Sequence, residues 1–195
     1  MGGRLTVFAL VALACCAIAA AASANADWTT HSRPSDGFAL ATPASWLDLT
    51  SSTPQVLDRA ARVPELHALI EVAKGSNLVR FICADPAGFP NVNVVETASR
   101  TIGLDEFVAE NVATIRQLPF VSRKPSVAPV SLPAGPAEFV SYRETVQGND
   151  VLTEQYYLVH RGRAYIVTYT ILPGSAGATA SAVSRSAGSF RFLTH

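Results

Sequence analysis

The chain has 195 residues, and its 15 lysines and arginines balance 15 aspartates and glutamates, so the formal net charge is zero. A neutral balance argues against nucleic acid or an anionic lipid surface as partner, since both select for basic patches. After residue 26 no apolar run is long enough to cross a bilayer, so we expect no transmembrane segment in the remainder, which has the length of one domain.

The first 26 residues have the pattern of a secretory signal peptide. Arg4 provides a basic start, and a mostly apolar run follows from Leu5 to Ala22. The sequence Ala24-Asn25-Ala26 then matches the small-x-small pattern of a cleavage site. We therefore expect cleavage before Asp27 and a mature protein that is secreted to the extracellular space or the periplasm.

The cysteines raise a second possibility for this leader. Leu13-Ala14-Cys15-Cys16 resembles a bacterial lipobox, but the residue before the modified Cys16 should be Gly or Ala, and here it is Cys15. We therefore expect cleavage after Ala26 rather than lipid anchoring at Cys16. After the leader only Cys83 remains, in an apolar strand-like run, so we expect a buried thiol and no internal disulfide.

Turn residues and prolines divide the first half of the chain. The polar residues 27–36 predict a flexible N-terminal segment. After it, alternation, proline positions and turn chemistry predict these elements in order: a strand at 37–43, a short strand within 44–49, a helical stretch that Pro54 opens, Pro64 breaks and Gly75 ends, and strands at 78–84 and 91–98.

The clearest predicted helix covers 104–118. It has one apolar stripe, and Asp105 and Glu106 lie in its first turn, where the helix dipole favours acidic groups. The remaining pattern predicts strands at 120–132, 136–146, 151–160 and 163–172, a helix at 176–187 and a terminal strand at 190–193. Both faces of 163–172 are partly apolar, which indicates a sheet covered on each side.

Three groups of residues, taken in order, resemble the PsbP/Mog1 superfamily, including the secreted actinobacterial LpqN-type proteins. They are the opening Gly37-Phe38 to Pro43 with Trp46, the helix start Phe107-Val108, and the finish Gln155–Val159, Ala164–Tyr169 and Ser189–Phe192. The resemblance implies an α+β fold, an antiparallel sheet flanked by helices, in a single domain at 37–195. It also implies that these motifs are structural and that the protein binds another protein.

Residues that could carry chemistry do not form a recognisable motif. Ser175 lies in Gly-Ser-Ala-Gly, which is not the Gly-x-Ser-x-Gly turn of a nucleophile, and we expect it near a helix N-terminus. The histidines are scattered, without ligand spacing, at His31, His67, His160 and His195. Three carboxylates fall on adjacent predicted strands, where two could meet: Glu138, Glu144 and Glu154. We predict no catalytic residue, no cofactor and no metal site.

Aromatic residues provide the best candidates for a binding surface, although most of them are expected to pack in the core, Trp46 and Tyr169 among them. Tyr156 and Tyr157 are neighbours in one strand and must point to opposite faces, so one of them belongs to the core. A tight turn with three further polar residues follows. The candidate surface comprises Tyr156, Tyr157, His160, Arg161 and Arg163.

The sequence is most consistent with an exported, non-enzymatic binding module of the cell envelope or extracellular space that recognises a protein or another envelope component. Two alternatives are an exported hydrolase with a non-standard site and a carrier of a small amphiphile. A deep pocket that holds Glu144 or Glu154 next to His160 would favour the hydrolase. A closed apolar cavity would favour the carrier.

Overall fold

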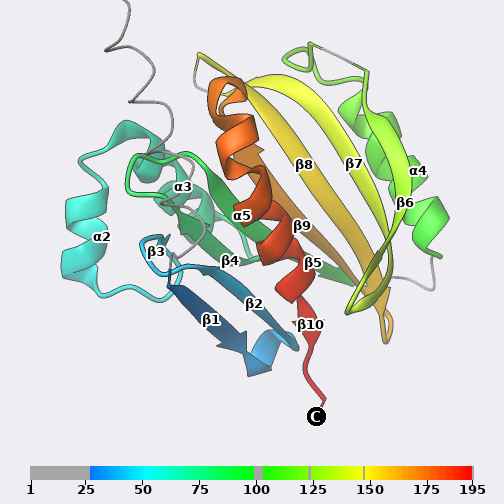
Figure 1. The fold of residues 1–195 in the computed structure, drawn as a ribbon, viewed down its shortest axis with the longest axis horizontal. Coiled ribbons are helices and arrows are strands. Elements are labelled where there is room, and N and C mark those ends of the chain that lie inside the picture. Colours follow the sequence, from blue (N-terminus) through cyan, green and yellow to red (C-terminus); the bar gives the residue numbers. More distant parts are fainter. Residues whose placement is uncertain (1–26, 99–102, 123, 147, 195) are drawn as a thin grey trace, which may run out of the picture.

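The computed structural model describes residues 27–98, 103–122, 124–146 and 148–194 (Figure 1). The predicted signal peptide at 1–26, with its lipobox cysteine Cys16, lies outside the described residues, as does His195. No helix in the described ranges combines the length and the apolar character that a bilayer span requires.

Strands dominate the described chain. In order, its elements are β1 (Trp28–Arg33), η1 (Pro34–Asp36), β2 (Phe38–Pro43), β3 (Leu47–Asp48), α2 (Pro54–Ala60), α3 (Pro64–Gly75), β4 (Val79–Ala84), β5 (Asn91–Ala98), α4 (Leu104–Ile115), β6 (Ser126–Leu132), β7 (Gly135–Val146), β8 (Asn149–His160), β9 (Arg163–Ile171), η2 (Pro173–Ser175), α5 (Ala176–Ser189) and β10 (Arg191–Phe192).

The strands form two antiparallel sheets. A seven-stranded sheet has the order β3-β4-β5-β9-β8-β7-β6, and a small sheet has the order β1-β2-β10. Register in the large sheet is continuous across its centre, where Tyr157 pairs with Ile166 and Tyr156 pairs with Val167. The α+β architecture, an antiparallel sheet flanked by helices, is therefore confirmed.

Successive residues of a strand point to opposite faces of the sheet. In the large sheet both alternate sets include apolar residues, so both faces are covered. One face carries α4 over β7 and β8, and α3 over β4. The other face packs against α5 and the small sheet, and Figure 1 shows α5 lying across this face. Trp46 (8% exposed) and the fully buried Tyr169 belong to the core of this second face, as expected.

The N-terminal segment differs from the expectation of an irregular segment at 27–36, because it forms β1 and η1. Trp28–Arg33 forms β1, an edge strand paired with β2 from Trp28↔Pro43 to Arg33↔Phe38. The Arg185 guanidinium of α5 lies 4.3 Å from the Trp28 ring centroid and fixes this strand to the helix. The polar composition is typical of an edge strand, and its pairing depends on contacts with distant residues.

A glycine is required where the turn between β4 and β5 meets α3. Gly88 has a φ of 91°, a left-handed conformation that side chains rarely adopt. A Cβ atom at this position would also collide with the side chain of Glu65. The turn can therefore lie directly on α3 only because residue 88 has no side chain.

Candidate functional site

The structure does not bring the five predicted binding residues onto one surface. Tyr157 lies beneath α4 with 1% of its surface exposed, and its ring meets that of Phe107 edge-on at 5.6 Å. Tyr156 points to the opposite face, where it is half-buried against Phe139 and Tyr169. Tyr157 is therefore a core residue, and its inclusion in a surface was wrong.

The other three residues of that prediction lie together at the turn between β8 and β9. Arg161 and Arg163 are exposed, and the His160 ring stacks on Phe192 at 4.0 Å. Arg163 Nη1 lies 3.0 Å from Glu96 Oε1, so its charge is partly neutralised within the chain. This group is an exposed turn rather than a concave site.

The strand carboxylates do not pair. Glu154 is opposite Ser141 in the register and lies on the α5 face, whereas Glu144 lies on the α4 face and accepts a hydrogen bond from Thr153 at 2.6 Å. His160 shares the face of Glu154 but is six residues further along β8, about 20 Å away. Burial raises the pKa of Glu154, without a histidine beside it. The geometry expected of the hydrolase alternative is therefore not present around these residues.

A different polar cluster connects the two sheets, and the sequence did not indicate it. His31 Nε2 lies 2.9 Å from Thr42 Oγ1, and His31 Nδ1 lies 3.5 Å from Asp48 Oδ2. This connectivity resembles a nucleophile, base and orienting acid. Thr42 is completely buried, however, so its hydroxyl cannot meet a substrate in this structure.

The electrostatics of this cluster fit a structural link. Burial alone would raise the pKa of Asp48, but the His31 hydrogen bond, the Arg33 charge and two backbone hydrogen bonds outweigh it and hold the pKa below its usual value. Cys83 Sγ lies 3.5 Å from Thr42 Oγ1, and burial raises the pKa of this thiol to about 12. The cysteine is therefore buried and unreactive, as expected.

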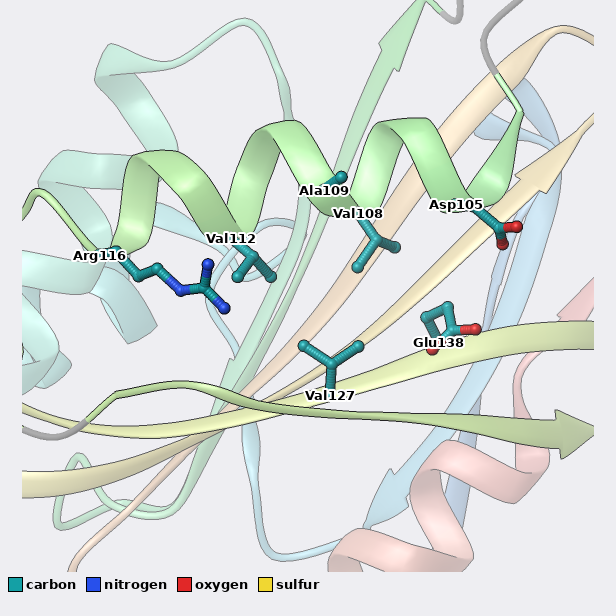
Figure 2. A pocket seen from close by; sticks show the side chains of 7 residues that line it. All are labelled: Asp105, Val108, Ala109, Val112, Arg116, Val127 and Glu138. Carbon is teal, nitrogen blue, oxygen red and sulfur yellow. The ribbon is translucent and has the colours of Figure 1, made fainter.

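A groove between α4 and the outer strands of the large sheet is the best candidate site (Figure 2). It has a volume of about 360 Å³. The residues that line it come from α4, from the position directly after α4, from β6 and from β7. They are Asp105, Val108, Ala109, Val112, Arg116, Val127 and Glu138.

The groove follows from the width of a single helix. An α-helix with its side chains is about 10–12 Å wide, and neighbouring strands are about 4.8 Å apart, so one helix covers roughly two strands. Helix α4 covers β7 and β8, and the edge strand β6 lies beyond it. Val127 of β6 is consequently 45% exposed, although it faces the same side as the buried Val140. An apolar strip remains open to solvent.

Charged groups lie at the two ends of this apolar strip. Asp105 and Glu138 lie at the end near the start of α4, and Arg116 lies at the opposite end (Figure 2). Arg116 also lines an adjoining depression with Lys124. Among the described residues, these four side chains form no ion pair with one another or with other groups.

Strand β6 is protected against pairing with another strand. Pro129 has no N–H to donate, so within an otherwise continuous β6–β7 ladder its nitrogen must face away from β7. The open edge therefore lacks a donor at its centre, which blunts addition of a further strand. The groove can bind a ligand mainly through side chains.

Sequence reasoning missed this groove, although two of its signals were visible. The apolar stripe of α4 and its acidic first turn were both identified, and Glu138 was considered only as a partner for other carboxylates. The exposure of Val127 depends on which strands α4 covers. Within the described ranges, no group of three or more His, Cys, Asp or Glu residues could hold a metal ion.

The sequence matches no protein-family model and no curated protein at a significant level. Solved structures do resemble it. Cyanobacterial PsbP from Synechocystis sp. PCC 6803 matches with a TM-score of 0.56 and 12% identity, over 86% of this chain and 94% of that protein. LpqN of Mycobacterium tuberculosis, which is involved in cell envelope biogenesis, matches with a TM-score of 0.52 and 12% identity, over 87% and 92%.

A protein from Bacteroides thetaiotaomicron matches with a TM-score of 0.54 and 9% identity, over 85% of this chain and 48% of that protein. Identities this low identify a shared fold and transfer no activity. The sequence resemblance to the PsbP/Mog1 superfamily is supported at the level of architecture, and the chain has the α+β fold of PsbP and LpqN.

Proposed function

We propose that this protein is an exported, non-enzymatic binding module whose groove between α4 and β6 binds an exposed segment of a protein partner in the cell envelope or extracellular space. The observation that carries the proposal is an open groove with an apolar floor and charged ends. A floor of valines binds an apolar side chain, and charged ends select its neighbours.

Two further observations support this assignment over the alternatives. The groove is open along its length, whereas a carrier of a small amphiphile needs an enclosed apolar cavity. The His31–Thr42–Asp48 cluster is the closest approach to a nucleophilic site among the described residues, and its hydroxyl is buried. Export itself is proposed from the leader at 1–26, and the envelope role of LpqN is consistent with such a location.

Photo-crosslinking from within the groove tests this function. A benzoylphenylalanine replaces Ala109, which lines the groove, and in a matched control it replaces Glu110, the next residue on the exposed side of α4. In cell-envelope fractions we expect one defined protein crosslinked from position 109 and much less from position 110. The additional change Val127→Ser should remove that product, because it replaces an apolar side chain in the floor of the groove with a polar one.

Equal crosslinking from both positions, or a product that persists after Val127→Ser, would contradict the proposal. Absence of any product from position 109 in envelope and culture fractions would contradict it as well.

A further inference from the structure

The two ends of the groove carry opposite charges, and this arrangement indicates which kind of segment can bind there. Asp105 and Arg116 lie eleven residues apart on α4, an axial separation of about 16 Å at about 1.5 Å per residue. Across the groove, Glu138 is opposite Pro129, two residues beyond the Val127↔Val140 pair. The acidic end, the apolar floor and the basic end therefore follow one another along a single line (Figure 2).

An extended peptide matches this spacing. Its side chains on one face repeat every second residue, at about 6.7 Å, so residues i, i+2 and i+4 span about 13 Å. A long cationic side chain at one end and an acidic one at the other can bridge the remaining few ångströms. The central side chain then lies over Val108, Val112 and Val127.

We propose, building on the function above, that the groove recognises an extended segment with a basic residue, an apolar residue and an acidic residue at alternate positions. The basic residue lies against Asp105 and Glu138. The acidic residue lies against Arg116, next to the depression that Lys124 lines. The protein thus selects a zwitterionic segment of about five residues.

The charges of the groove argue for this occupant over two others. An amphiphile with one anionic head could pair with Arg116, but its chain would cover Asp105 and Glu138 and remove water from them without compensation. A partner strand added to β6 would meet the missing donor of Pro129 at the centre of the edge. A zwitterionic segment satisfies both ends of the groove by side-chain contacts.

The test uses three synthetic nine-residue peptides with blocked termini, each with a five-residue centre between two Ser-Gly flanks. Their centres are Lys-Ser-Leu-Ser-Glu, Lys-Ser-Leu-Ser-Lys and Glu-Ser-Leu-Ser-Glu. We expect the zwitterionic peptide to bind the mature protein roughly two- to fivefold more tightly than either of the others, because an exposed ion pair contributes about that factor. Amide chemical shifts report both the affinity and the site.

A charge-reversed protein makes the test independent of the peptides' own properties. In the double variant Arg116→Glu with Lys124→Glu both ends are acidic, so the Lys-Ser-Leu-Ser-Lys peptide should become the tightest ligand. The matched control, Arg59→Glu with Arg62→Glu, changes the net charge equally at exposed positions outside the groove. It should keep the original order of affinities.

A reversed order in the groove variant alone supports the proposal. Equal affinities for all three peptides, or the same order in both double variants, would overturn it. So would saturable binding of dodecyl phosphate that excludes the zwitterionic peptide, or a dimer of the protein alone that Val127→Ser dissociates. If the crosslink from position 109 forms while the peptides show no charge preference, the proposed charge specificity is wrong and the proposed binding function is still supported.

Discussion

The two faces of the large sheet are covered to different extents by the elements that pack on them. On one face α5 and the small sheet together cover the centre, where the aromatic rings of Phe38, Tyr165 and Phe190 pack with at most 2% of their surface exposed. On the other face α4 alone covers β7 and β8 and leaves β6 outside. The comparison indicates that the first face provides most of the stability, and the second leaves open the groove for which we propose recognition.

The largest expected effect lies on the closed face, where Tyr169 is fully buried and its hydroxyl donates a hydrogen bond to Ser186 at 2.9 Å. Tyr169→Ala removes a large buried ring and should lower the free energy of unfolding by about 3–5 kcal/mol. Denaturant unfolding measures the loss, and Tyr169→Phe provides the control, with about 1 kcal/mol for the hydrogen bond alone. A loss below about 1 kcal/mol in Tyr169→Ala would mean that this face is not the main core.

A smaller effect is expected at Asp48, which joins the small sheet to the large one through His31 and Arg33. Its pKa is lowered in the folded protein, so the link stabilises the fold above the unfolded pKa and is lost as the pH falls through the folded value. Asp48→Asn should cost about 1–3 kcal/mol at pH 7, because it leaves the partly buried guanidinium of Arg33 uncompensated.

The pH dependence separates this electrostatic link from simple packing. The difference in unfolding free energy between the natural protein and Asp48→Asn should shrink as the pH falls below about 4, towards and through the lowered pKa. Unfolding curves at pH 7, 5 and 3 measure it. A difference that stays constant over this range would show that the carboxylate charge contributes nothing.

The smallest stability effect is expected on the open face. Val127→Ser replaces a side chain that is 45% exposed, so the free energy of unfolding should change by no more than about 0.5 kcal/mol. Binding in the groove should nevertheless fall, whereas Val127→Ile should preserve it. A substantial loss of stability in Val127→Ser would break the distinction between the two faces and assign β6 to the core.

The order of elements was readable from the sequence because it depends on local signals. Prolines 54 and 64 begin α2 and α3, and the acidic first turn and apolar stripe located α4. The burial of Trp46, Cys83 and Tyr169 also followed from alternation and residue type, whereas the antiparallel sheet was implied by the family resemblance. The fold resemblance rested on the order of these same local features.

The candidate site was less predictable. Tyr156 and Tyr157 were correctly separated to opposite faces, but alternation does not say which face a helix covers, and Tyr157 proved to lie under α4. The His31–Thr42–Asp48 cluster joins residues from β1, β2 and β3. Of these, His31 belongs to a segment predicted to be flexible, and Asp48 belongs to a short predicted strand. No spacing along the chain marks such a contact.

By itself, the sequence determined most of the segments that become helices and strands, because hydrophobic period, proline position and turn chemistry act within a few residues. Only the tertiary structure decided that residues 28–33 form β1, that Tyr157 is buried and that Val127 is exposed. The formation of β1 depends on pairing with β2, whereas the burial of Tyr157 and the exposure of Val127 depend on how far a helix of fixed width extends over strands of fixed spacing. The same geometry placed Asp105 and Glu138 at one end of the groove and Arg116 at the other.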